Sequence, residues 1–278
     1  MVADDYSAGD TADLLGLQSF KSDVESGWDG RNGNCVLLGA AVEKSATENA
    51  ATNIKNLHPV PSSTEEGELC INGMSFSNRD SLWANSALVV TVSQDDSILE
   101  KYRSHGCLAG LEFQRDMERK AFQLGGRNMT VPVQRLTDFV NGVVSSSIPT
   151  SSYRLGAVSA PCHEIYPKPL YNALANAITE HFEKQMPGFF CEDALLHGVE
   201  TRTSSPLRLV RNQSTFEAGG VENLFPAGEG AGFAGGIVSA AVDGLVVADA
   251  IKAKFFLTNI DGEVNPLYSK KKSIGFDY

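Results

Sequence analysis

A glycine-rich segment near the carboxyl end constrains the fold of this chain more than any other feature. Residues 226–244 read PAGEGAGFAGGIVSAAVDG and lie between a predicted strand at 223–226 and a predicted helix at about 235–254. Glycine permits a tight turn and lets the backbone approach a ligand closely. The start of the helix presents unpaired N–H groups and the positive end of its dipole. The segment therefore predicts a binding loop for an anionic or electron-rich ligand.

The same segment satisfies the dinucleotide-binding pattern G-x-G-x-x-G at Gly230, Gly232 and Gly235. In the first βαβ unit of a dinucleotide-binding fold, a strand with an acidic residue follows about twenty residues later. Residues 255–261 are the only match to that strand, and little sequence remains beyond them for the rest of a doubly wound sheet. We therefore expect the segment to be a distal element of the site.

Composition excludes several classes of function. Hydrophobic residues make up 42% of the chain and charged residues 21%, which indicates a globular protein, and the net charge of −11 disfavours nucleic acid and anionic membranes as partners. The longest apolar run, at 235–251, is interrupted by Asp243 and Asp249, so no transmembrane span is predicted. The five cysteines form no C-x-x-C pair and the histidines lack metal-ligand spacing. We expect no metal, buried cysteines and a reducing compartment.

Hydrophobic periodicity predicts two helices before the glycine segment. The first covers 108–124, with Phe113, Met117, Ala121 and Leu124 on its core face, and ends at Gly125-Gly126. The second covers 170–186, with a core stripe of Leu174, Ile178, Phe182 and Met186, and with His181 at the core edge. Short apolar runs predict strands at 35–42 and 129–134, a hairpin that joins 69–71 to 87–92 through Asn72-Gly73, and a strand–turn–strand at 195–210.

Four blocks of the chain, in order, resemble one protein family. They are residues 68–77 continuing through 83–92, then 111–115, 195–205 and 224–244. Over about residues 58–254 the chain is similar to the carboxyl-terminal portion of a poorly characterised family of FAD-dependent dehydrogenases, which are FAD/NAD(P)-binding oxidoreductases. The resemblance implies a mixed α/β fold, namely a truncated Rossmann-like flavoprotein fold with a substrate-domain insertion.

The resemblance also implies a cofactor site. The residues that it places against FAD are Gly228, Glu229, Gly230, Gly232, Gly235, Gly236 and Ile237. Glu229 would stand near the ribityl chain or the pyrophosphate, and the helix start would face the pyrimidine edge of the flavin. Residues 201–203 would lie near the ring or the substrate, which makes Arg202 the candidate catalytic residue. The alternative for Arg202 is an ion pair beneath the sheet.

The chain departs from the family before residue 58. The family begins with a strand, a glycine-rich turn and a helix that hold the ADP half of FAD, and residues 1–57 contain no such unit. The domain prediction is an acidic extension at 1–57, a substrate-type domain with part of the FAD-domain sheet at 58–220, the flavin motif at 221–256 and a tail at 257–278. We expect FAD to be lost or weakly bound, and residues 1–57 or a partner to cover the exposed sheet edge.

Three functions remain open. The first is a degenerate, non-catalytic relative that serves as a structural or interaction subunit of a larger assembly. The second is an active FAD-dependent oxidoreductase whose nucleotide-binding segment comes from a longer chain or a partner. The third is a binding module for another anion. The distribution of the family suggests an organelle, a plastid, as the location.

Overall fold

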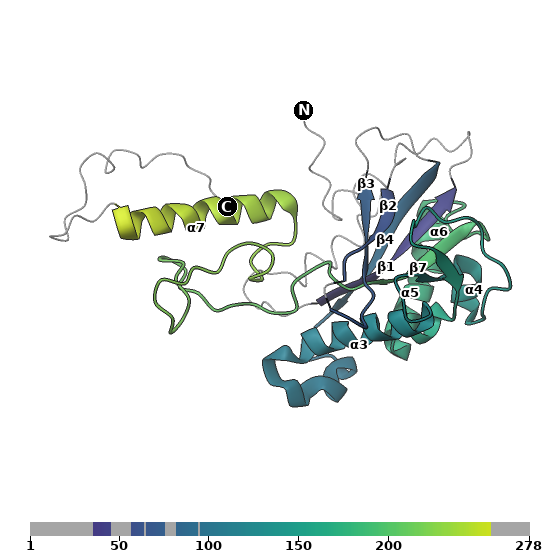
Figure 1. Cartoon of the computed structure of the whole chain (residues 1–278), viewed down its shortest axis with the longest axis horizontal. Coiled ribbons are helices and arrows are strands. Elements are labelled where there is room, and N and C mark those ends of the chain that lie inside the picture. The colour runs from purple at the N-terminus through teal and green to yellow at the C-terminus, as the bar shows by residue number, and fades with distance from the viewer. Residues whose placement is uncertain (1–35, 46–56, 64, 76–81, 94, 257–278) are drawn as a thin grey trace. The chain divides into compact units, whose positions relative to one another are not determined.

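The computed structural model describes residues 36–45, 57–63, 65–75, 82–93 and 95–256. The chain forms two compact units, which divide between Leu207 and Arg208. The elements of the larger unit are β1 (Val36–Ser45), β2 (Leu57–Pro61), β3 (Ile71–Ser75), β4 (Trp83–Val92), η1 (Ser97–Leu108), α3 (Ala109–Leu124), β5 (Val131–Arg135), α4 (Leu136–Asn141), β6 (Ala157–Ser159), η2 (Cys162–Glu164), α5 (Lys168–Asn176), η3 (Ala177–Phe182), α6 (Glu183–Gln185) and β7 (Ala194–Glu200). In the smaller unit the structure describes one helix, α7 (Ile237–Phe256) (Figure 1).

Five strands of the larger unit form one sheet in the order β4-β1-β7-β5-β6. Neighbouring strands run antiparallel except for β5 and β6, which are parallel. Strand β1 belongs to the predicted extension at 1–57, yet it pairs along its length with β4 and also with β7. Part of that extension is therefore an interior strand of the sheet. The predicted mixed α/β class is confirmed.

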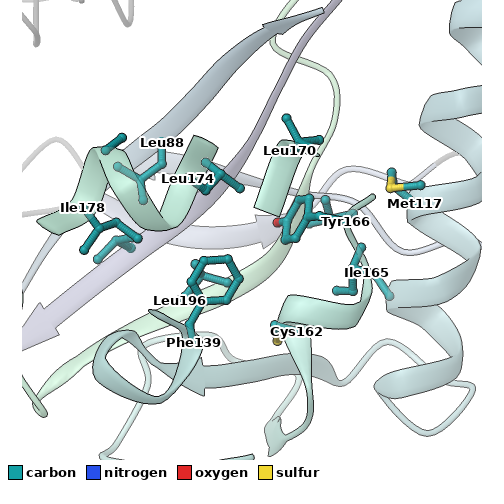
Figure 2. Packing of buried hydrophobic residues seen from close by; sticks show 14 of the residues in the cluster. Leu88, Met117, Phe139, Cys162, Ile165, Tyr166, Leu170, Leu174, Ile178 and Leu196 are labelled. Atoms are coloured by element: carbon teal, nitrogen blue, oxygen red, sulfur yellow. The ribbon is translucent and has the colours of Figure 1, made fainter. Parts of the chain in front are cut away.

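Helices cover the sheet with a continuous hydrophobic core. Phe113 and Met117 of α3, Phe139 of α4 and Leu174 of α5 pack there with almost no exposed surface. Figure 2 shows Leu170, Leu174 and Tyr166 close together, with Phe139 beside Leu196 of β7. The core stripe predicted for residues 108–124 is confirmed, because its first three members are fully buried and the fourth packs against the core.

The predicted hairpin around Asn72-Gly73 is wrong. These residues lie inside β3, which pairs with β2, whereas β4 pairs with β1. The connection between β2 and β3 is closed by the Ser62 amide, which donates to the Cys70 carbonyl at 2.8 Å. Glycine at position 73 lets the Asn85 side chain pack closely against the β3 backbone, since a Cβ there would lie 3.3 Å from that side chain.

The second predicted helix is present but is not uniform. Residues 168–185 form α5, a π-helical turn η3 and the short α6, one after another. Leu174, Ile178 and Phe182 are buried as predicted, whereas His181 is exposed and not at the core edge. A π-helical turn adds a residue to one helical turn and so rotates the residues that follow it.

Two predicted strands are absent from the described residues. Residues 206–210 form no ladder. Just before them, after the end of β7, the side-chain amide of Gln114 on α3 donates to the carbonyls of Thr201 and Ser204. Residues 223–226 form no strand either, since the Ala218 amide donates to the Leu224 carbonyl in a compact turn. Local side-chain and turn hydrogen bonds replace strand pairing at both places.

Gly125→Ala tests the end of α3. A Cβ at Gly125 would lie 2.1 Å from the Thr130 carbonyl oxygen, so the backbone must move. We expect a loss of about 2–3 kcal/mol in the free energy of unfolding, measured with urea and circular dichroism. Gln123→Ala, at an exposed site in the same last turn, should change it by less than about 0.5 kcal/mol. Equal stability of the two variants would refute the contact.

Candidate functional site

The glycine segment of the smaller unit is a series of turns that ends at α7. Gly228 and Gly232 have φ angles of +70° and +80°, which non-glycine residues rarely adopt. The two turns are closed within the segment, because the Gly232 amide donates to the Glu229 carbonyl and the Phe233 amide donates to the Gly228 carbonyl. All seven residues predicted to bind the cofactor therefore belong to one continuous loop and helix start.

The predicted site residues differ in how much space surrounds them. A Cβ added at Gly230 or Gly235 would meet no atom within 4 Å, so the backbone faces open space at both positions. The Glu229 side chain is exposed, and its partial desolvation raises the pKa of its carboxyl. Ile237, the first residue of α7, is 69% exposed. These residues leave room for a ligand within the smaller unit.

A buried ion pair holds the beginning of the glycine segment. Arg211 donates to both carboxylate oxygens of Asp243, at 3.0 and 2.5 Å, and also to the Pro226 carbonyl at 2.6 Å. The Gly228 amide donates to Asp243 Oδ2 at 2.8 Å. The guanidinium lies 3.5 Å from the centre of the Phe233 ring. Desolvation alone would raise the pKa of the Asp243 carboxyl, but the hydrogen bonds from Arg211 and Gly228 outweigh it and lower this pKa. The carboxylate therefore stays charged.

The start of α7 is a second structured part of this site. The Gly236 amide donates to Ser239 Oγ at 3.1 Å, and the Ser239 hydroxyl donates back to the Gly236 carbonyl at 3.0 Å. The following amides of the first helical turn have no intrahelical acceptor, and the helix dipole makes this end positive. Negative charge on a ligand would be stabilised here.

Residues 201–203 lie in a separate polar cluster of the larger unit. Arg202 donates from Nε to Glu118 Oε1 at 3.1 Å and from Nη2 to Oε2 at 2.9 Å, and from Nη1 to the Ser62 carbonyl. The Thr201 hydroxyl also donates to Glu118, which is 1% exposed. The ion pair that was one alternative for Arg202 is therefore present. A direct catalytic role for this residue stays a prediction.

Glu118 and Gln114 of α3 were not among the core residues predicted for this helix. Both are nevertheless buried. They stand four residues apart, each one position after a core residue, Phe113 or Met117. That spacing continues the buried face, so it was the available signal.

Glu200, at the end of β7, is a buried carboxyl that sequence reasoning also missed. It is 7% exposed, and its Oε2 atom has no hydrogen-bond partner among the described residues. Burial raises the pKa of Glu200 to about 7. Burial likewise raises the pKa values of the Cys70 and Cys162 thiols, so both behave as the small apolar side chains that were expected, whereas Cys107 is exposed.

The described residues offer neither a metal site nor a membrane span. No group of three or more His, Cys, Asp or Glu side chains in this part of the chain could hold a metal ion. No helix in the same part is both long and apolar enough to cross a membrane.

Comparisons with known proteins identify one family, whose match lies in the larger unit, and one relative. The model of a family described as "FAD-dependent protein, C-terminal domain-like" matches residues 59–203, somewhat more than half of the chain. A protein of Clostridium beijerinckii (strain ATCC 51743 / NCIMB 8052), described as an uncharacterized protein, is 48% identical over 200 residues. The match covers 71% of this chain and 36% of that relative, so the chain spans about a third of the relative's length.

Glu200→Gln should change how stability depends on pH. The folded protein holds the Glu200 proton more tightly than the unfolded chain, so this stabilisation is complete below pH 4.5 and is lost as the pH rises through about 7. At pH 8 the variant should be more stable than the wild type by up to about 3 kcal/mol in urea unfolding, and at pH 4.5 the two should be alike. The exposed Glu192→Gln is the control, and an unchanged pH profile in Glu200→Gln would refute the assignment.

Arg202→Met should destabilise the larger unit by about 3–5 kcal/mol, because it leaves the Glu118 carboxylate buried without its partner. Adding Glu118→Gln should restore part of the loss. Lys184→Met breaks the exposed pair with Glu180 and should cost less than about 1 kcal/mol. If Arg202→Met unfolds at the same urea concentration as the wild type, the pair is not structural.

Proposed function

This chain belongs to the FAD-dependent protein, C-terminal domain-like family, and we propose on that premise that it supplies the ring-side part of an FAD site in a flavin-dependent oxidoreductase. The glycine segment carries the proposal. Its backbone faces open space at Gly230 and Gly235, and it ends at the positive end of α7. A flavin gains negative charge at its pyrimidine edge on reduction, and a preorganised helix start stabilises such charge.

The ADP half of FAD is assigned to another segment in this proposal. A longer chain or a partner supplies it, and the chain's coverage of about a third of the Clostridium relative supports that view. Contacts to the pyrophosphate and the ribose carry much of the affinity for FAD. This chain alone therefore binds FAD weakly or not at all.

A non-catalytic structural subunit is the second candidate. The contacts of Arg202, the candidate catalytic residue, favour this candidate. The Arg202 guanidinium already donates to Glu118 and to the Ser62 carbonyl inside the larger unit. An interior ion pair accounts for Arg202 without a substrate. Under this candidate the chain acts through protein partners in an organelle, with a plastid as the expected location.

Gly235→Val distinguishes the two candidates. Its new side chain meets no protein atom near Cβ but enters the space assigned to the flavin. The protein is purified from its source with its partners, its visible absorption spectrum is recorded, and the released FAD is quantified. We expect about one FAD per wild-type chain and about a tenfold weaker affinity in Gly235→Val, equivalent to about 1.4 kcal/mol.

Gly244→Ala is the matched control, because it also adds carbon atoms to open space in the smaller unit but lies inside α7. It should bind FAD as the wild type does. Absence of flavin from the wild-type complex would reject the flavin site and favour the non-catalytic subunit. Equal FAD binding by Gly235→Val and the wild type would reject the placement of the flavin at Gly235.

A further inference from the structure

The Arg211–Asp243 pair controls two consecutive peptide groups of the glycine segment. Arg211 donates to the Pro226 carbonyl, and Asp243 accepts from the Gly228 amide. The peptide groups on both sides of Ala227 are thereby tied to charged partners. Charge-assisted hydrogen bonds of this kind are about twice as strong as neutral ones, so neither peptide group rotates without a large loss.

The same pair reaches the far end of the turn. The Phe233 ring lies under the Arg211 guanidinium, and its own amide donates to the Gly228 carbonyl. The side chains of Arg211 and Asp243 are 7% and 14% exposed, so water competes little for these contacts. Both ends of the turn at 228–233 are therefore fixed by one buried ion pair.

This arrangement decides which amides are open to a ligand. The Gly228, Gly232 and Phe233 amides all donate to protein acceptors. The amides of Ala234 and Gly235, by contrast, have no hydrogen-bond acceptor among the described residues. They are followed by Gly236, whose amide donates to Ser239 Oγ, and then by the first turn of α7.

We propose that Arg211 and Asp243 are positioning residues for the flavin: they hold the Gly228 amide inward and so leave the amides of Ala234, Gly235, Ile237 and Val238 as the donors that meet the pyrimidine edge, while the Gly236 amide is held by Ser239. This inference rests on the proposed function. It separates the residues of the glycine segment that the ion pair holds, at 226–228 and Phe233, from the donors that face the ligand, beyond Phe233. An anionic group cannot use the Gly228 amide, because the carboxylate of Asp243 already occupies it.

The smaller unit contains a matched control pair. Lys254 donates to Glu217, and Glu217 also accepts from a backbone amide, that of Asn223. This pair therefore resembles Arg211–Asp243 in chemistry, in that a carboxylate joins a cation to a backbone N–H. These two hydrogen bonds of Glu217 join it to Asn223 and Lys254, which lie on either side of the glycine segment and not within it.

The first measurement is amide hydrogen exchange of the full chain without flavin. In the wild type the Gly228 amide should exchange slowly, and Asp243→Asn should speed its exchange about tenfold or more. Asp243→Glu keeps the charge and should restore part of the protection, and Glu217→Gln should leave it unchanged. Circular dichroism confirms that α7 is retained. Equal exchange of Gly228 in the wild type and in Asp243→Asn overturns the proposal.

The second measurement is flavin binding by the protein purified with its partners. Asp243→Asn should weaken FAD binding about tenfold and shift the visible flavin spectrum, Asp243→Glu should recover part of both, and Glu217→Gln should change neither. Equal weakening in Glu217→Gln overturns the positioning role. If the wild type binds no flavin, the proposed function fails and the ligand assignment fails with it, while hydrogen exchange separately decides whether the pair holds the loop.

Discussion

The buried carboxylate of Glu118 joins three separate parts of the larger unit. Glu118 lies on α3, and its carboxylate accepts hydrogen bonds from Thr201 and Arg202, which follow β7. The backbone carbonyl of Glu118 accepts a hydrogen bond from the Leu69 amide. A buried charge is tolerated only when its lone pairs are engaged in this way. The turn before β3, helix α3 and the end of β7 must therefore adopt their positions together. Hydrophobic packing alone would not specify that arrangement so closely.

The sequence was a good guide to local structure and a poor one to strand pairing. The helix at 109–124 was predictable because its 3.6-residue period and its terminal glycines are encoded within one short stretch. Asn72-Gly73 was misread, because β3 pairs with the preceding strand β2, whereas β4 pairs with the more distant β1. The pairing of β1 with β7 joins residues at least 150 positions apart, so no local sequence pattern could predict it.

In the candidate site, too, the features encoded in one short stretch were predictable and those formed by distant residues were not. The glycine segment was visible as a composition pattern, and its two left-handed glycines agree with that interpretation. Arg211 and Asp243 are 32 residues apart and meet only through the tertiary fold. In the sequence, Asp243 was noticed only as an interruption of an apolar run. Glu200 was invisible for a related reason, since its protonation is a property of burial and not of its neighbours in sequence.

The sparse core of the smaller unit has a calorimetric consequence. Its buried hydrophobic side chains in the described part are Ala231, Ala234 and Val247, whereas Ile237 and Leu245 of α7 are 69% and 68% exposed. The heat capacity and enthalpy changes of unfolding scale with the surface that folding buries. The larger unit should therefore dominate the heat absorbed on melting, and the smaller unit should add only a broad, shallow transition. Whatever covers α7 would sharpen that transition and move it to higher temperature.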